Sequence, residues 1–251
     1  MNLKMNSEIL YIGHRGTRTN FDENTIDAFK KAIEFGAEYI EFDVRKTKDK
    51  KLIILHDSSL NRTTNGSGKL KNFNYNEIKK YRTKNHKCAI PLLSEVLEEL
   101  KGLVKFIIEL KDDDLTDGIL EIVNNYSILE ECIFSGRNLI DLQEIKKIYP
   151  KSRICYNITK GLGLKIKDFL RLGRFKQLEF KLDLINLRSN LISLEFIEIC
   201  HNNNIKSLAW DFISYNNPIF QIKSLIDLGI DGILFDNHRN ITKIKSWVSL
   251  T

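Results

Sequence analysis

Two carboxylates in the short apolar run 39–44 have the spacing of a metal site. Glu41 and Asp43 are two residues apart, and because side chains alternate along a β-strand, both point to one face. Carboxylates on a buried face repel each other and are costly to desolvate unless a cation or protons neutralise them. Glu109, in the apolar run 104–110, adds a third carboxylate. Oxygen ligands of this kind predict a divalent cation, Mg²⁺ or Ca²⁺, rather than zinc.

Two histidines and two cations lie at the ends of similar apolar runs. His14 and Arg15 directly follow one run, His56 ends another, and Lys111 follows the run that holds Glu109. Imidazole titrates near neutral pH, so a pair of histidines can supply a general base and a general acid. Arginine and lysine are the cations that bind a phosphate. Singly, each residue has a plainer structural interpretation, but their joint placement predicts metal-assisted phosphoryl chemistry.

The elements that must position these residues alternate between short β-like runs and longer stretches of helical period. Eight such units in this length predict an α/β fold of the (β/α)8 TIM-barrel type, whose active site lies at the carboxyl ends of the strands. A doubly wound open sheet would more often show fewer strands and a glycine-rich first turn. The expected strands cover residues 9–13, 39–44, 52–56, 104–110, 132–135, 153–156, 205–210 and 232–235.

Two segments do not fit the repeat, and we interpret both as loop insertions of one barrel domain that covers residues 1–251. The first is a small insertion after the third strand, residues 57–89, and the second is residues 175–193. The first insertion is rich in lysine, with aromatic residues between the lysines. We interpret it as a solvated excursion whose aromatic side chains pack against the barrel, rather than as a surface for phosphate-bearing partners.

Composition excludes several classes of protein. The hydrophobic fraction of 42% argues against disorder. No apolar run approaches the roughly 18 residues that span a bilayer, so no transmembrane segment is expected. Residues 1–10 lack the pattern of a secretory signal, and the four cysteines are widely spaced, so we expect a cytoplasmic protein with reduced thiols. The net charge of +6 is too mild to indicate nucleic acid as a partner, and nothing indicates an oligomeric state.

The motifs together resemble those of the glycerophosphodiester phosphodiesterase family, which shares its barrel with the phosphatidylinositol phospholipase C-like phosphodiesterases. The resemblance spans nearly the whole chain. It is carried by Gly13-His14-Arg15-Gly16, Glu23-Asn24-Thr25, Ile40-Glu41-Phe42-Asp43-Val44, Thr47-Lys48-Asp49, His56-Asp57, Leu60-Asn61-Arg62-Thr63, Pro91-Leu92-Leu93-Ser94-Glu95, Ile108-Glu109-Leu110-Lys111, Ala209-Trp210 and Gly229-Ile230-Asp231-Gly232.

The resemblance implies hydrolysis of a small-molecule glycerophosphodiester to sn-glycerol 3-phosphate and an alcohol, with a divalent cation as cofactor. By this match His14 and His56 are the catalytic acid and base. The metal ligands are Glu41, Asp43 and Glu109, and the substrate contacts are Arg15, Lys111 and Trp210. Which histidine is the base, and whether water or a glycerol hydroxyl attacks, stay open from the sequence.

The chain departs from the family pattern at the expected substrate rim. Gly136 stands where the family has Phe, and Asp211-Phe212-Ile213 replaces the family's Thr-Val-Asn. The additional carboxylate of Asp211 suggests a preference for a cationic headgroup such as choline. Two other functions remain alternatives, namely a phospholipase D-like or sphingomyelinase D-like barrel that acts on intact lipids, and a catalytically silent binding barrel.

Overall fold

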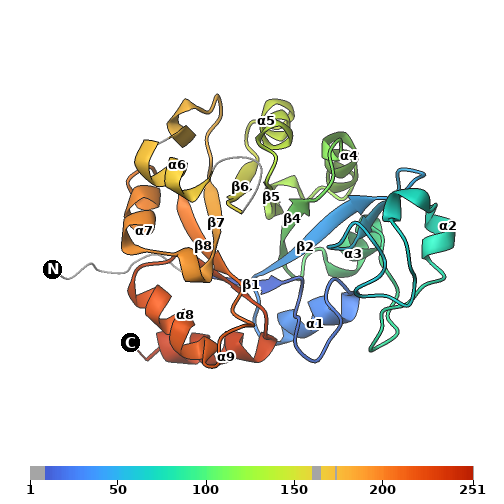
Figure 1. The fold of residues 1–251 in the computed structure, drawn as a ribbon, viewed down its shortest axis with the longest axis horizontal. Helices are drawn as coiled ribbons and strands as arrows, with labels where there is room; N and C mark the ends of the chain where they lie inside the picture. The colour runs from blue at the N-terminus through green and yellow to red at the C-terminus, as the bar shows by residue number, and fades with distance from the viewer. Residues whose placement is uncertain (1–8, 160–164, 173, 251) are drawn as a thin grey trace.

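The computed structural model describes residues 9–159, 165–172 and 174–250, and its strands form a closed barrel (Figure 1). Eight parallel strands make the ring in the order β1-β2-β4-β5-β6-β7-β8-β9, and β9 pairs with β1. The predicted TIM barrel is therefore confirmed. The ring strands are β1 (Leu10–His14), β2 (Tyr39–Lys46), β4 (Lys105–Leu110), β5 (Cys132–Gly136), β6 (Arg153–Asn157), β7 (Leu184–Arg188), β8 (Lys206–Trp210) and β9 (Gly232–Phe235).

Helices surround the ring and cover its outer face (Figure 1). They are α1 (Ile26–Glu34), α3 (Leu93–Leu100), α4 (Thr116–Asn125), α5 (Leu139–Ile148), α6 (Ile166–Leu172), α7 (Leu194–His201), α8 (Pro218–Asp227) and α9 (His238–Val248). The large apolar core lies between this helical layer and the strands.

A smaller core fills the inside of the ring. Each of the eight ring strands contributes one buried side chain to it, namely Ile12, Tyr39, Ile107, Ile133, Cys155, Leu184, Leu208 and Leu234. Tyr39 and Ile107 share their inward face with the neighbouring carboxylates on β2 and β4, because alternate residues of a strand point to the same side. The barrel interior is therefore an apolar plug with polar side chains above it, at the carboxyl ends of the strands.

Two strand assignments made from the sequence are wrong. The expected third strand, β3 (Leu52–Ile54), lies outside the ring and pairs antiparallel with the end of β2. Only five residues separate β2 from β3, and a connection this short permits a hairpin but not a parallel crossover. The missing ring strand is β7, which lies inside residues 175–193, the segment interpreted as a loop insertion. Its five residues are interrupted by Asn186, which hides the apolar run.

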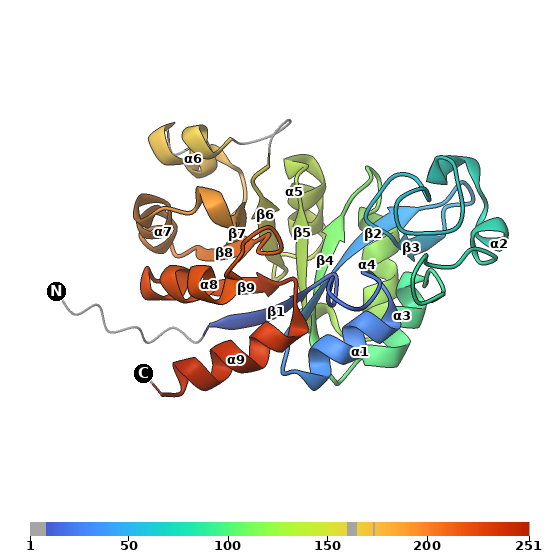
Figure 2. The same ribbon diagram turned by 60° about the horizontal axis from the view of Figure 1, so that its bottom comes forward.

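The first excursion, between β3 and α3, has an apolar cluster of its own. It contains a 3-10 turn at Leu70–Asn72 and the short helix α2 (Tyr75–Ile78). The expected aromatic packing is present, with Phe73, Tyr75 and Tyr81 against this cluster, which also includes Ile53 of β3. The β2–β3 hairpin runs from the ring to the excursion, which forms one flank of the molecule (Figure 2).

Candidate functional site

Three carboxylates converge above the apolar plug, as strand alternation predicts. Asp43 of β2 lies directly beside Glu109 of β4 in the sheet register, and Glu41 lies one pleat below Asp43. One ligand oxygen from each side chain can be chosen so that all lie within 4.8 Å of one another, and all three residues are buried. The three predicted metal ligands therefore share one small volume.

The charge of this cluster is only partly balanced by the protein. Burial is the largest influence on Glu41, and together with Asp43 and Glu109 it raises the pKa of Glu41 well above its usual range. Burial would also raise the pKa of Asp43, but Lys111 and Arg15 outweigh it and hold that pKa below its usual range. Lys111 Nζ lies 3.0 Å from Asp43 Oδ1 and also pairs with Glu109.

The carboxylate oxygens of the cluster fit a divalent cation. Glu41 Oε2 accepts a hydrogen bond from the backbone N–H of Arg15 at 2.9 Å, and Asp43 Oδ2 accepts one from Asn24 Nδ2 at 2.7 Å. Of the other two oxygens, Asp43 Oδ1 faces Lys111 Nζ at 3.0 Å, whereas Glu41 Oε1 is buried and accepts no hydrogen bond from the described residues. Buried oxygens without donors are costly, and hard oxygen ligands suit Mg²⁺ or Ca²⁺.

The turn after β1 is shaped to deliver these contacts. Arg15 adopts a left-handed backbone with φ of 52°, and Gly16 follows with φ of 76°. A Cβ at Gly16 would lie 2.7 Å from the carbonyl carbon of Ala28, so this position requires glycine. Asn24, with φ of 60°, precedes Thr25, whose hydroxyl accepts a hydrogen bond from the N–H of Ala28 and so caps α1.

His14 is held by a carboxylate from the last strand of the ring. Its Nδ1 lies 2.7 Å from Oδ1 of Asp236, which follows β9 directly. Burial would raise the pKa of Asp236, but His14, Arg18 and the N–H of Phe212 outweigh it and lower that pKa. An ionised carboxylate only accepts hydrogen bonds, so Nδ1 of His14 carries the proton and Nε2 is left to exchange protons at the site.

His56 is also held by a carboxylate. Its Nδ1 lies 2.6 Å from Asp57 Oδ1, and Arg62 donates to both oxygens of Asp57, at 2.7 and 2.9 Å. The Arg62 hydrogen bonds are the main reason that the pKa of Asp57 lies below its usual range. Burial, with Arg15 and Lys111, lowers the pKa of His56. Each candidate histidine is therefore oriented by its own carboxylate.

A chain of alternating charges joins the two histidine–carboxylate pairs. Glu23 accepts hydrogen bonds from Arg15 at 2.8 Å and from Arg62 at 2.7 Å, and its other oxygen lies 3.5 Å from Arg18 Nε. Arg18 in turn donates to Asp236 at 2.9 Å. Through these arginines, Glu23 links Asp236, the partner of His14, to Asp57, the partner of His56.

The predicted site residues surround one cavity of about 150 Å³. Seven of the eight line it, and Asp43, with no exposed surface, lies beneath it. Trp210 lies at the end of β8 and packs edge-on against His14, with ring centroids 6.2 Å apart. The lining residues predicted from the sequence are His14, Arg15, Glu41, His56, Glu109, Lys111 and Trp210.

The sequence of this chain is similar along its length to known enzymes. Residues 14–136 match the model of the glycerophosphoryl diester phosphodiesterase family. Over 248 residues the chain is 32% identical to the glycerophosphodiester phosphodiesterase of Caldanaerobacter subterraneus subsp. tengcongensis, which covers 94% of this chain and 97% of the relative. The chain belongs to the glycerophosphodiester phosphodiesterase family. The family and the enzyme class predicted from the sequence are thus confirmed.

Solved structures of this family share the fold. The glycerophosphodiester phosphodiesterase of Thermotoga maritima is 27% identical, with a TM-score of 0.77 over 94% of this chain and 98% of the other. A phosphodiesterase of Oleispira antarctica, solved in complex with the product sn-glycerol-3-phosphate, has a TM-score of 0.82 at 21% identity, over 97% of each chain. The overall fold of this chain is therefore shared with these structures.

Six further cavity residues were not predicted from the sequence, namely Leu234 and five polar or charged residues that include Thr159. Arg45, Arg137, Asn157 and Asn186 also line the cavity. Asn157 and Asn186 are polar residues on β6 and β7, so the signal was a polar position near a strand end. For Asn186 the signal was lost because β7 itself was missed. Within the described residues, Asn186 Oδ1 and Trp210 Nε1 are buried without a hydrogen-bond partner.

The suggestion that Asp211 favours a cationic headgroup is not supported by the geometry. Arg188 lies on the preceding ring strand and reaches Asp211 Oδ2 with its Nε at 2.6 Å and with Nη2 at 2.5 Å. The carboxylate is therefore neutralised within the protein.

Of the residues that the structure describes, no helix has the length and apolarity needed to cross a membrane.

Proposed function

We propose that this protein hydrolyses glycerophosphodiesters to sn-glycerol 3-phosphate and an alcohol. The observation that carries the proposal is the convergence, on one cavity, of two carboxylate-held histidines, a carboxylate cluster and two phosphate-binding cations. Family membership and the product bound to the Oleispira relative support the same reaction. In the net reaction the P–O bond to the leaving alcohol breaks, and the proton lost by water appears on that alcohol.

The cluster Glu41, Asp43 and Glu109 would hold a divalent cation, Mg²⁺ or Ca²⁺. Such an ion supplies charge neutralisation for the phosphate oxygens when it is bound. The protein's own share of the phosphate site is Arg15 and Lys111, which are both buried cations that line the cavity. Their attachment to Asp43 fixes their positions before substrate arrives, so little reorganisation is needed as charge develops.

The two histidines divide the proton transfers. One imidazole removes a proton from the attacking hydroxyl, and the other protonates the departing alkoxide. Asp236 and Asp57 keep the Nδ1 atoms occupied, which leaves both Nε2 atoms for the reaction. This arrangement resembles a carboxylate–imidazole pair in which the carboxylate sets the tautomer and stabilises the imidazolium.

Trp210 and Asn186 are suited to the glycerol moiety. Glycerol offers hydroxyl donors and acceptors together with a short apolar edge. Trp210 has a ring face and an unpartnered Nε1 donor, and Asn186 has an unpartnered Oδ1 acceptor. Buried polar groups that lack protein partners are expected to find them in the ligand.

The decisive experiment measures release of the leaving alcohol from each substrate, together with glycerol 3-phosphate from the water-soluble diesters. Glycerophosphoglycerol, glycerophosphocholine and an intact phospholipid are each supplied with and without a chelator. We expect release from the two water-soluble diesters only, abolished by the chelator and restored by Mg²⁺ or Ca²⁺. Turnover restricted to the intact lipid would favour the lipid-cleaving alternative, and absence of all turnover would contradict the proposal.

Matched histidine variants test the site within this reaction. His14→Ala and His56→Ala are each expected to lower kcat by at least about a hundredfold. His201→Ala is the control, since His201 is a half-exposed histidine at the end of α7 outside the cavity. Near wild-type kcat in either site variant would remove that histidine from the mechanism.

A further inference from the structure

The positive charge of this chain is concentrated beside the active site. Residues 45–89 contain 13 Lys and Arg against 3 Asp and Glu, a net charge of 13 − 3 = +10. The whole chain carries only +6, so the remaining residues carry 6 − 10 = −4. This segment comprises the β2–β3 hairpin and the excursion, which form the flank seen in Figure 2.

A groove of about 700 Å³ collects much of this charge. It runs between the hairpin, the 3-10 turn of the excursion and the loop after β4, and it has seven cationic and three acidic lining residues. Arg45 and Lys111 line both this groove and the active-site cavity, so the two spaces share a wall. The cations are Arg45, Lys46, Lys48, Lys50, Lys69, Lys71 and Lys111, and the acids are Asp112, Asp113 and Asp114.

The acidic residues of the groove are occupied by only some of the cations. Asp112 pairs with Arg45, and Asp114 lies 3.5 Å from Lys46. Four other lysines are exposed and form no ion pair with any residue that the structure describes, namely Lys48, Lys50, Lys69 and Lys71. The lining residues of the groove therefore sum to a net charge of 7 − 3 = +4. Because Lys111 is already paired with Asp43 and Glu109, the charge available to a ligand is that of the exposed lysines.

The walls of the groove are fixed by backbone hydrogen bonds. The N–H of Lys48 in the hairpin donates to the carbonyl of Phe73 at 2.9 Å, and the N–H of Leu70 donates to the carbonyl of Ser58 at 2.9 Å. Lys48 is thereby held opposite the turn that bears Lys69 and Lys71. A preformed cluster of like charges attracts an anion more strongly than scattered lysines do.

The position of the groove indicates which part of the substrate it faces. Lys111 follows β4, and Trp210 ends β8, four strands from β4 in either direction around the ring of eight. The proposed glycerol wall and the groove therefore lie on opposite sides of the barrel axis. A phosphodiester whose glycerol lies against Trp210 directs its other ester arm toward Arg45, Lys111 and the groove.

We propose that this groove is a subsite for the leaving alcohol and that it selects alcohols that carry a second phosphate or a comparable anion. The inference rests on the proposed function, because it assigns the second arm of the same substrate. It also agrees with the neutralisation of Asp211 by Arg188, which removes the one carboxylate suggested to attract a cationic headgroup.

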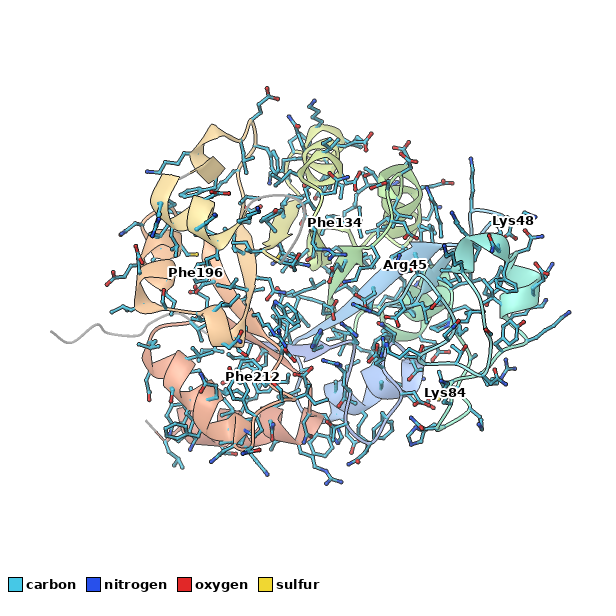
Figure 3. The ribbon with its side chains drawn as sticks, viewed as in Figure 1. Arg45, Lys48, Lys84, Phe134, Phe196 and Phe212 are labelled. Atoms are coloured by element: carbon cyan, nitrogen blue, oxygen red, sulfur yellow. The ribbon has the colours of Figure 1, made fainter. Side chains whose placement is uncertain are left out.

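Three substrates and two triple variants test the proposal. The substrates are glycerophosphoglycerol, its derivative with a phosphate monoester on the leaving glycerol, and glycerophosphocholine. The groove variant is Lys48→Gln/Lys69→Gln/Lys71→Gln. The control is Lys79→Gln/Lys80→Gln/Lys84→Gln, which removes the same charge from the excursion at residues that line neither space. Lys48 and Lys84 lie at opposite edges of this flank (Figure 3).

We expect wild-type kcat/KM to be about tenfold higher for the phosphorylated substrate than for glycerophosphoglycerol at about 0.02 M salt, with this ratio approaching one at about 0.5 M. The groove variant should lose the preference through a higher KM, and the control should keep it. Turnover of all three substrates without an anion preference would overturn the groove proposal and leave the proposed function standing.

Binding to vesicles that contain anionic lipid tests a second explanation, in which the groove lysines face a membrane rather than the substrate. Loss of vesicle binding in the groove variant, with the substrate preference unchanged, would identify the lysines as a membrane-facing surface and overturn the proposal. Absence of turnover with every substrate would overturn the proposed function, and the subsite with it.

Discussion

His14 Nδ1 lies 2.7 Å from Oδ1 of Asp236, so a candidate catalytic side chain at the first ring strand is held by a carboxylate at the last. The two residues end β1 and follow β9, which are neighbours in the ring although 222 positions separate them in the chain. Asp236 also accepts the N–H of Phe212 at 2.7 Å and Arg18 Nη1 at 2.9 Å. Three partners therefore fix the Asp236 carboxylate, which can hold the His14 imidazole in one tautomer.

Asp236→Asn should lower kcat while leaving KM nearly unchanged. The amide can keep the shape of the side chain but can present its N–H to Nδ1, which favours the wrong tautomer of His14. We expect a fall of at least about a hundredfold in kcat. Asp227→Asn, at an exposed carboxylate at the end of α8, is the control. A variant with unchanged kcat would show that Asp236 does not set the state of His14.

Glu23 should contribute to stability in a way that depends on pH. Burial would raise its pKa, but Arg62 and Arg15 outweigh it and lower the pKa from its usual 4.5 to about 2. A carboxyl group with a lowered pKa in the folded state stabilises the protein above its unfolded pKa. That stabilisation is lost as pH falls from about 5 toward 2.

Chemical unfolding from pH 7 down to pH 3 measures this contribution. Glu23→Gln should be less stable than wild type at pH 7 by about 2 kcal/mol, because three arginines lose their common anion. The gap between the two proteins should narrow in acid. A gap that is independent of pH would contradict the assignment of the low pKa to Glu23.

The residues that carry the proposed chemistry could be predicted from the sequence, but most of the residues that position them could not. Glu41 and Asp43 follow from strand alternation, because the signal is two residues apart in the chain. The pairing of His14 with Asp236 gives no local signal, since it is made only by the closure of the ring. Glu23 belongs to one of the family motifs, but its role gives no local signal, since it also depends on Arg62 of the excursion, 39 residues further along the chain.

For the strands, too, features with a local sequence signal could be predicted and features that depend on distant pairing could not. Segments with several consecutive apolar residues, such as Phe106–Ile108 in β4, were placed correctly. In β7 the inward-facing Asn186 interrupts the run, so the strand was taken for a loop. β3 has a strand pattern but pairs outside the ring. Only seven residues separate the expected strands 39–44 and 52–56, and this short connection is the one signal that could have revealed the hairpin.

Glu41→Gln should raise the concentration of divalent cation needed for half-maximal activity by about tenfold or more. Glu41 supplies a buried oxygen that no hydrogen bond satisfies within the described residues, and the amide removes the charge that would bind the cation. Calorimetric titration of the protein with Mg²⁺ or Ca²⁺ gives the same comparison without substrate. Cation affinity equal to that of wild type would remove Glu41 from the ligand set.

The roles of the two histidines should separate when the leaving group needs no proton. In-line displacement places the nucleophile and the leaving group on opposite sides of the phosphorus. His14 packs against Trp210 on the proposed glycerol side, and the carbonyl of His56 accepts a hydrogen bond from Arg45 Nε at 2.7 Å on the groove side. We therefore expect His14 to be the base and His56 the acid.

The p-nitrophenyl ester of glycerol 3-phosphate tests this assignment, because p-nitrophenolate leaves without a proton. With this substrate the kcat of His56→Ala should recover to within about tenfold of wild type, and the kcat of His14→Ala should stay low. Recovery of His14→Ala alone would reverse the two roles, and recovery of neither would contradict general-acid catalysis by a single histidine.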